Sequence, residues 1–211
     1  MPLYSVIQHN EKTKILVWKI EESLSDFGDI FLTEKSRQRI ANMKSESHIK
    51  GFLAVRKLLN EAALSDEDLF YTEDGKPHLK NGQVISISHS FDFSVIAISD
   101  NTIGIDIEKN REKIKRIATK FVDKESSYLK QEKLVEQLTV IWGAKESLFK
   151  IHPDGGLLFK QHLPIDKFDL DHKKTKGYIL KEPFNESYDV YFESFFGYTM
   201  VYATNEIKLD E

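Results

Sequence analysis

The stretch from Ile103 to Glu108 alternates apolar and acidic residues, and this alternation constrains the fold more than any other feature of the chain. Because residues two apart on a β-strand point to the same side, Asp106 and Glu108 share one face of the predicted strand. Ile105 and Ile107 share the opposite face, where burial is favourable. The pattern therefore predicts a strand anchored by one apolar face, with two carboxylates side by side on the other.

Two neighbouring carboxylates repel each other unless a cation or a proton lies between them. Oxygen ligands of this kind suit Mg²⁺, which binds through a few carboxylates together with substrate phosphate. The alternative interpretation of Asp106 and Glu108 is a solvated acidic strand face without function, because acidic side chains are usually exposed. The acidic pair by itself leaves a metal site and an exposed surface both open.

The segment from Lys133 to Ile151 shows the clearest helical periodicity. Its apolar residues recur at helical spacing: Leu134, Leu138, Ile141, Trp142, Leu148 and Phe149. Pro153 and Gly155 follow and oppose continuation of the helix. Glu146 and Lys150 are four residues apart and therefore neighbours on the helix surface. An ordinary surface ion pair is the alternative to a functional role for them.

A third polar cluster, Ser88-His89-Ser90, ends a strand-like apolar stretch that begins at Ile85. Strand ends beside tight turns are good places to present polar groups to a ligand. The alternatives are a serine-rich turn with a solvated histidine and a serine–histidine hydrolase site. No Gly-x-Ser-x-Gly sequence surrounds a serine of this chain, which argues against the hydrolase.

The remaining periodic segments divide between the two halves of the chain, with a division near Asp100. Residues 35–63 and 111–130 are predicted to be helical, the latter in one or two pieces. Strands are predicted at residues 4–8, 15–20, 84–88, 93–99, 103–108, 178–180, 189–195 and 198–203. Short links predict that 84–88, 93–99 and 103–108 form an antiparallel meander.

Composition excludes several classes of protein. The chain has 211 residues and no cysteine, so disulfides and thiolate metal sites are excluded, as is typical of the cytoplasm. A net charge of −4 argues against general nucleic-acid binding. The chain shows neither the basic start and apolar run of a signal peptide nor a run of about 20 apolar residues that would span a membrane. We therefore expect a cytoplasmic protein with neither a membrane nor a nucleic-acid partner.

Four motifs occur in one order: Gly75-Lys76-Pro77, Ser88-His89-Ser90, Gly104 to Glu108 and Trp142 to Lys150. Together they resemble the 4′-phosphopantetheinyl transferase superfamily, and the chain length resembles its single-chain, surfactin-type branch. The helix with Phe52, Leu53, Arg56 and Leu59 is similar to an upstream family element.

The resemblance implies an α/β (α+β) fold of two similar halves related by a pseudo-twofold axis. Each half would be a small, mainly antiparallel sheet packed on a long helix, with the active site between the halves. Residues 1–101 would form the coenzyme A adenylate side, and residues 102–211 the metal strand, the catalytic helix and the carrier-protein side. A monomer is also implied.

The implied reaction transfers the 4′-phosphopantetheine arm of coenzyme A to a serine of an apo carrier protein (acyl, peptidyl or aryl) and releases 3′,5′-ADP. By resemblance, Asp106, Glu108 and Glu146 bind Mg²⁺, with Mn²⁺ as the alternative ion. Glu146 and Lys150 would be catalytic, and Glu146 could be ligand, base or both. Coenzyme A would contact Arg56, Lys76, Ser88, His89, Lys145 and Lys150. Fatty-acid, polyketide and nonribosomal-peptide carriers all remain open.

Residues 111–120 carry five basic side chains and one acidic side chain. Because carrier proteins are typically acidic, Lys113, Lys115 and Arg116 are candidates for docking the carrier; the alternative is a solvated amphipathic helix. Two rival functions are a metal-dependent phosphodiesterase acting on coenzyme A-like substrates and an inactive module that binds coenzyme A or a carrier. The intact acidic residues and lysines argue against loss of activity.

Overall fold

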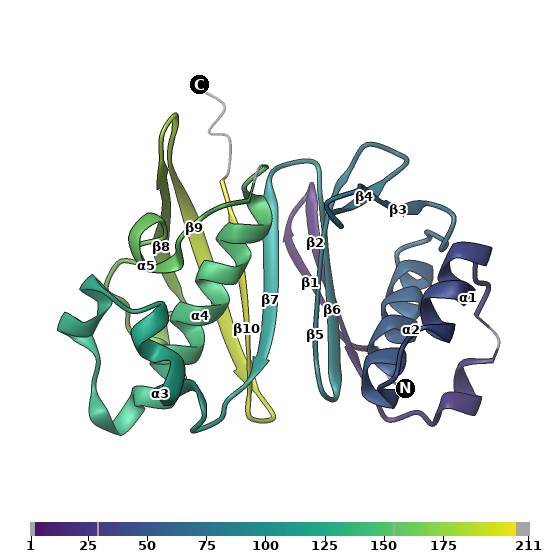
Figure 1. Ribbon diagram of the computed structural model, residues 1–211, viewed down its shortest axis with the longest axis horizontal. Coiled ribbons are helices and arrows are strands. Elements are labelled where there is room, and N and C mark those ends of the chain that lie inside the picture. The colour runs from purple at the N-terminus through teal and green to yellow at the C-terminus, as the bar shows by residue number, and fades with distance from the viewer. Residues whose placement is uncertain (1–2, 29, 154, 206–211) are drawn as a thin grey trace. The chain divides into compact units, whose positions relative to one another are not determined.

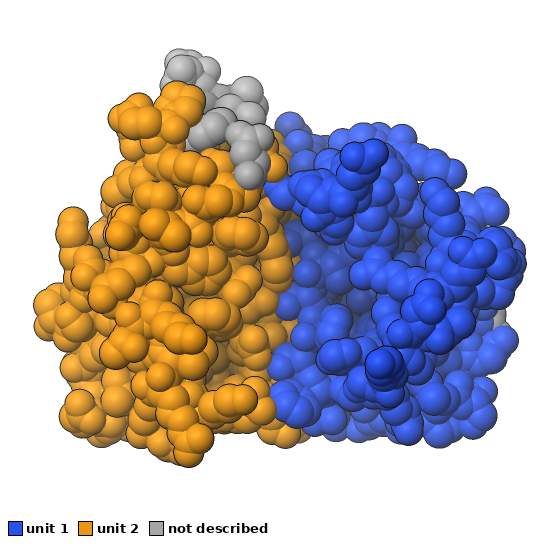
Figure 2. All heavy atoms as spheres, in the orientation of Figure 1, with its two compact units in different colours: residues 1–100 blue, residues 101–211 orange. Residues whose placement is uncertain are grey.

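Each half of the chain builds a four-stranded antiparallel sheet and packs a long helix against it. The computed structural model describes residues 3–28, 30–153 and 155–205. The chain divides into two compact units, Met1–Asp100 and Asn101–Glu211, which Figure 2 shows in different colours. The predicted class, a mixed α/β fold with antiparallel sheets and long helices, is confirmed.

The first unit has the strand order β1-β2-β6-β5 (Figure 1). Its strands are β1 (Leu3–Asn10), β2 (Thr13–Lys19), β5 (Val84–Ser90) and β6 (Phe93–Ser99). Its other elements are η1 (Leu24–Phe27), α1 (Glu34–Ala41), α2 (Glu46–Glu61), β3 (Leu69–Tyr71) and β4 (Pro77–Leu79). Leu53, Leu58 and Leu59 of α2 share one core with Leu16 and Ile96 of the sheet. The apolar side of α2 therefore covers one face of this sheet.

The helix predicted from Lys35 to Ala63 is interrupted between α1 and α2. Asn42 follows the last residue of α1, and Ser45 caps the start of α2, where its side chain accepts a hydrogen bond from the backbone N–H of His48. A serine in this position satisfies a backbone donor that the start of a helix leaves without an intrahelical acceptor. The apolar periodicity alone did not reveal this second helix start.

The second unit has the strand order β7-β10-β9-β8. Its strands are β7 (Ile103–Lys109), β8 (Lys174–Lys181), β9 (Phe184–Phe195) and β10 (Tyr198–Thr204). Its helices are α3 (Ile114–Ile117), η2 (Ala118–Lys120), η3 (Lys124–Tyr128), η4 (Gln131–Lys133), α4 (Leu134–Ile151), α5 (Phe159–His162) and η5 (Leu170–His172). Leu138, Ile141 and Leu148 of α4 share a core with Val190 and Val201 of the sheet. The predicted long helix is thus confirmed as α4, and it covers the metal-strand candidate β7.

The predicted three-strand meander is wrong for its last strand. β5 pairs antiparallel with β6, as expected, but β7 pairs with β10 in the second sheet. This register places Asp106 opposite Val201 and Glu108 opposite Thr199. Alternation specifies which residues share a face of a strand, but it does not specify which strand lies beside it.

The segment between β7 and α4 also differs in detail from the prediction. Instead of one or two helical pieces over residues 111–130, it forms the short helix α3 followed by 3-10 turns. Its apolar residues Ile114, Ile117 and Ala118 still pack against the core of the unit, and Phe121 is fully buried in that core. Within the part of the chain that the structure describes, no helix is long and apolar enough to cross a membrane.

Candidate functional site

The acidic residues of β7 lie on the side of the strand that α4 covers. Gly104, two residues before Asp106, lies directly against the backbone of α4, and residues two apart share a face. Asp106 is only 5 % exposed, and Glu108 is half-buried. Ile105 and Ile107 are buried on the opposite face. The alternative of a solvated acidic face is therefore wrong for Asp106.

Two glycines let α4 approach the sheet more closely than larger residues would permit. A Cβ atom at Gly104 would lie 2.0 Å from the carbonyl oxygen of Ser147. A Cβ atom at Gly143 would lie 2.7 Å from Cγ2 of Val201 and 3.7 Å from Oδ2 of Asp106. Glycine inside a strand commonly marks such a close backbone approach. The short distance between α4 and β7 is what brings helix side chains to Asp106.

Lys150 crosses from α4 to β7. Its ammonium lies 2.9 Å from Oδ1 of Asp106 and donates a hydrogen bond of 2.6 Å to the carbonyl oxygen of Ile105. The Lys150 side chain is 28 % exposed, so it is accessible from solvent while its ammonium is bound. The structure thus pairs Lys150 with a carboxylate on another element, beyond the helix-surface contact that its spacing from Glu146 predicts.

Glu146 lies one turn before Lys150 on α4 and is half-buried. Burial raises the pKa of Glu146 to about 7; the negative charge of Asp106 acts in the same direction, Lys150 opposes it, and Glu108 adds to it. Carboxylates influence one another in this way only when they are near neighbours. The fold therefore brings Asp106, Glu108 and Glu146 into one electrostatic environment, from a strand and from a helix.

Asp106, Glu108 and Glu146 can be compared with the ligands that a magnesium ion prefers. Among the residues described, no three or more histidine, cysteine, aspartate or glutamate side chains are arranged to hold a metal as they stand. The oxygen chemistry nevertheless fits, because Mg²⁺ uses few carboxylates and keeps waters and phosphate as further ligands. A cation would also offset the negative charges of Asp106 and Glu108, which add to the effect of burial on the pKa of Glu146. The donor set fits the ion chemically, and the ligand assignment stays a prediction.

Lys145, predicted to contact coenzyme A, lies in the interior of the second unit. Its side chain is 0 % exposed, and its ammonium lies 2.7 Å from Oε1 of Glu125. It also donates hydrogen bonds to the carbonyl oxygens of Phe121, at 2.6 Å, and Phe159, at 3.1 Å. Burial lowers the pKa of Lys145, and Glu125 opposes this effect. Contact with a phosphate stays a prediction and would require this ammonium to leave the interior.

Arg56, the predicted cation for the 3′-phosphate, is buried in the first unit and 3 % exposed. Its Nε donates a hydrogen bond of 2.9 Å to Oδ1 of Asp66. Its two terminal nitrogens donate to Ser36 Oγ, at 3.2 Å, and to the Phe52 carbonyl oxygen, at 3.4 Å. The guanidinium therefore joins α1 and α2 internally, and its phosphate contact stays a prediction.

The other predicted coenzyme A contacts of the first unit are more accessible. Lys76 is half-buried in the turn before β4, which Gly75 enables with a φ of +85°. Ser88 is half-buried and His89 exposed near the end of β5. The His89 ring lies 5.9 Å, centroid to centroid, from the ring of His48 in the first turns of α2. Ser88 and His89 are thus at the edge of the sheet beside the start of α2.

The predicted carrier-docking residues lie at and around α3. Lys113, Lys115 and Arg116 are exposed, whereas Ile114 and Ile117 are half-buried against the core. Lys115 pairs with Glu112 at 2.8 Å on the surface. The apolar side of the segment is therefore fixed to the protein, and its basic side faces solvent.

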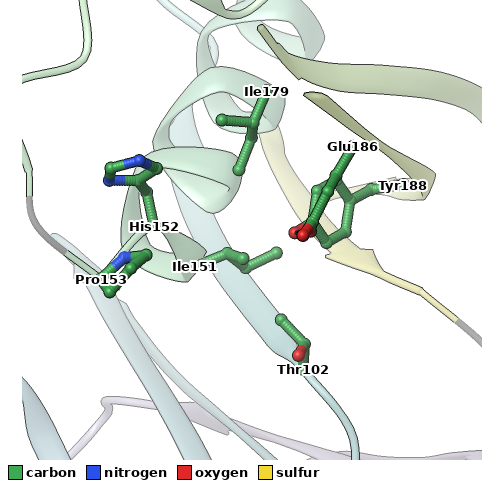
Figure 3. Close-up of a pocket in the computed structure, with 7 residues that line it drawn as sticks. All are labelled: Thr102, Ile151, His152, Pro153, Ile179, Glu186 and Tyr188. Carbon is green, nitrogen blue, oxygen red and sulfur yellow. Dashed lines mark hydrogen bonds between the residues drawn. The ribbon is translucent and has the colours of Figure 1, made fainter. Parts of the chain in front are cut away.

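A small cavity lies elsewhere in the second unit, at the end of α4. Its volume is about 150 Å³, and it is lined by Thr102, Ile151, His152, Pro153, Ile179, Glu186 and Tyr188 (Figure 3). The Tyr188 hydroxyl donates a hydrogen bond to Glu186. Ligand pockets usually measure about 300–1,000 Å³. This cavity is too small for coenzyme A, and its described lining contains none of the predicted site residues.

Gly104 and Gly143 lie within predicted motifs, but no role was predicted for them or for Glu125 from the sequence. The two glycines did carry a signal, because glycine inside a strand or helix costs stability and commonly marks a close approach. Glu125 carried none, since an acidic residue in a polar segment resembles any solvated side chain. Its burial became visible only in the folded chain.

Comparison with known proteins adds two findings. The sequence profile of the 4′-phosphopantetheinyl transferase superfamily matches residues 102–203, which include β7, α4 and β10. A 4′-phosphopantetheinyl transferase of Aneurinibacillus migulanus is 31 % identical over 162 residues. That match covers 72 % of this chain and 66 % of the relative, just under two thirds of its length.

Proposed function

We propose that this chain, which belongs to the 4′-phosphopantetheinyl transferase superfamily, transfers the 4′-phosphopantetheine arm of coenzyme A to a serine of an apo carrier protein. The observation that carries the proposal is the contact of Lys150 with Asp106, which sets the helix that bears Glu146 against the acidic strand β7. Lys150, bound to Asp106, adds a cation at the same place. Clustered carboxylates beside a lysine are suited to a substrate that carries a pyrophosphate.

The proposed transfer is a single displacement at phosphorus. The serine oxygen of the carrier forms a bond to the phosphorus nearer the pantetheine, the bond from that phosphorus to the oxygen of 3′,5′-ADP breaks, and the serine proton passes to a base. Glu146 is the candidate base, since it is a half-buried carboxylate whose pKa is raised to about 7. Lys150 is the candidate for neutralising charge on the phosphates, because it is a cation whose side chain is 28 % exposed beside the acidic residues.

Asp106, Glu108 and Glu146 are the residues that would hold Mg²⁺ or Mn²⁺. A bound ion of this kind offsets the negative charge of a pyrophosphate and orients it. In the first unit, Lys76, Ser88 and His89 are the proposed contacts for the adenylate end of coenzyme A. Residues 1–101 would thus serve coenzyme A, and residues 102–211 the metal and the carrier.

The partner proposed is an acidic carrier protein that approaches Lys113, Lys115 and Arg116. Their exposure and the anchoring of Ile114 and Ile117 support this choice. The class of carrier, whether acyl, peptidyl or aryl, is not specified by these residues. The cytoplasmic location and the monomeric state stay predictions.

One assay tests the proposal. The protein is mixed with coenzyme A, Mg²⁺ and several unrelated apo carriers, and the mass of each carrier is measured. We expect at least one carrier to gain the phosphopantetheine arm, and Asp106→Asn to abolish the gain. Asp171→Asn, the same change at an exposed aspartate of the second unit, is the matched control and should leave transfer intact.

The same assay separates the rival functions. Release of phosphopantetheine without a carrier would indicate a phosphodiesterase. Binding of coenzyme A with neither release nor transfer would indicate an inactive module. If no carrier of any class gains the arm from the wild-type protein, the proposed transfer is wrong.

A further inference from the structure

Glu125 and Lys145 form an ion pair in the interior of the second unit, with side chains 1 % and 0 % exposed. A buried ion pair adds little stability over well-packed apolar side chains, because both charges lose their hydration. The stability of the unit therefore does not by itself account for the pair. The pair does fix the orientation of the two side chains, because hydrogen bonds to charged groups fix geometry more tightly than apolar contacts do.

Lys145 uses all of its donors in this interior site. Its ammonium contacts Glu125 and the carbonyl oxygens of Phe121 and Phe159, which matches the three donors of a lysine. Phe121 precedes α4, and Phe159 begins α5. Lys145 therefore ties the middle of α4 to segments on both sides of it in the chain.

Glu125 is held from its other side by backbone groups. Its Oε1 accepts a hydrogen bond of 3.1 Å from the N–H of Ile165, and its Oε2 accepts one of 2.9 Å from the N–H of Asp123. Backbone donors cannot move away as a side chain can. Glu125 is consequently a fixed point in the interior, to which Lys145 and its helix are attached.

The attachment controls how α4 is turned about its axis. Successive residues of a helix point about 100° apart, so Lys145 leaves α4 on a different side from Glu146 and Lys150. Holding Lys145 in one direction therefore sets the directions of Glu146 and Lys150. The glycine contacts of Gly104 and Gly143 determine how near the helix lies to the sheet. The buried side chains of Leu138, Ile141 and Leu148 also resist rotation, and the Glu125–Lys145 pair adds a directional contact at the residue next to Glu146.

We infer that Glu125 is a positioning residue: through Lys145 it sets the rotation of α4 and thereby aims Glu146 and Lys150 at Asp106. The kinetic consequence of this inference rests on the proposed transfer. Its structural consequence, the dependence of the Lys150–Asp106 contact on the buried pair, stands on the geometry alone. Lys145 then acts on the site through the helix, without touching coenzyme A.

The kinetic test uses the full chain and three variants. Glu125→Gln removes the charge and keeps the shape. The double variant Glu125→Leu/Lys145→Met removes both buried charges together, although the backbone groups that bind them lose their partners. Glu193→Gln removes a carboxylate from the exposed Lys173–Glu193 pair and is the matched control. For each protein, kcat and the KM for coenzyme A are measured together with urea unfolding.

We expect Glu125→Gln to lower kcat at least about tenfold with little change in the KM for coenzyme A. A small misplacement of Glu146 or Lys150 would slow the transfer step. The double variant should keep the low kcat under conditions in which urea unfolding shows it to be folded, and the control should match the wild type. A double variant with wild-type kcat would reduce the pair to a structural role and overturn the inference. A rise in the KM for coenzyme A confined to the double variant would instead assign Lys145 to the phosphates, and would also overturn it.

A second measurement does not depend on transfer. Lys150→Met is introduced into the wild type and into the double variant, and its effect on the urea midpoint is compared. We expect a larger shift in the wild type, since the contact with Asp106 is already weakened where the buried pair is missing. Equal shifts in the two backgrounds would overturn the inference. If the wild type transfers no arm, the proposed function fails, and this comparison still decides the role of Glu125.

Discussion

The ammonium of Lys150 lies 2.9 Å from Oδ1 of Asp106, although the two residues are 44 positions apart in the chain. The contact joins the last turn of α4 to the middle of β7 and places a cation beside an almost fully buried carboxylate. It depends on the close approach of helix and strand at Gly104 and Gly143.

Replacing Lys150 with methionine should destabilise the protein by about 1–3 kcal/mol, because Asp106 stays buried while its cation is lost. Urea unfolding measures the change. Adding Asp106→Asn to Lys150→Met should recover part of the loss, since the uncompensated charge is removed as well. Lys173→Met, at an exposed ion pair, is the control and should change stability by less than about 0.5 kcal/mol. Additive effects of the two site changes would contradict a direct contact.

Gly104→Ala should separate α4 from β7. Its Cβ would lie 2.0 Å from the carbonyl oxygen of Ser147, and backbone atoms can only yield if the whole helix shifts. We expect a loss of about 1–3 kcal/mol in unfolding free energy, as for other overpacked sites, and a fall in transfer activity. Gly28→Ala is the control, because Gly28 is helical and its new Cβ would make an ordinary contact at 3.4 Å. Wild-type stability of Gly104→Ala would show that the close approach is not required.

Reversing the charge of Lys115 and Arg116 to glutamate should raise the KM for an acidic carrier about tenfold at low salt, and less as salt screens the charges. The KM for coenzyme A should stay unchanged, because these side chains are exposed at α3. Steady-state kinetics with the carrier and with coenzyme A as varied substrate give the two constants. Lys176→Glu, at an exposed lysine of β8, is the control. An unchanged KM for the carrier would assign the docking surface elsewhere.

Asp66 should make the stability of the protein sensitive to acid. Burial raises the pKa of Asp66, but hydrogen bonds from Ser36 and Thr33 and the charge of Arg56 outweigh burial and leave that pKa below its ordinary value. A carboxyl whose pKa is lowered on folding stabilises the protein at neutral pH, and this contribution is lost as pH falls from about 4 through the folded pKa.

Thermal unfolding across pH 2–7 tests the role of Asp66. Asp66→Asn should lower stability at neutral pH by about 3–5 kcal/mol, because the buried Arg56 loses its partner. The variant should also lose less stability on acidification than the wild type. Glu67→Gln, at the exposed neighbouring position, is the control. The same acid dependence in Asp66→Asn as in the wild type would exclude Asp66 as its source.

The sequence by itself determined the local elements and the set of motifs. The helix predicted at 133–151 is found as Leu134–Ile151, because apolar spacing and a following proline are local properties that act before any tertiary contact forms. The alternation around Asp106 likewise determined which residues share a face of β7. The order of the motifs indicated the superfamily, and the profile of that superfamily matches residues 102–203.

Only the tertiary structure decided which groups meet and which are buried. The partner of β7 is β10, and Asp106 lies under α4 where an exposed acidic face was the alternative. Lys145 and Arg56 resemble phosphate-binding cations in the sequence, yet both are enclosed in ion pairs, with Glu125 and Asp66. The physical reason is that periodicity reports the direction of a side chain from its own element, whereas burial and charge pairing depend on distant segments that pack around it.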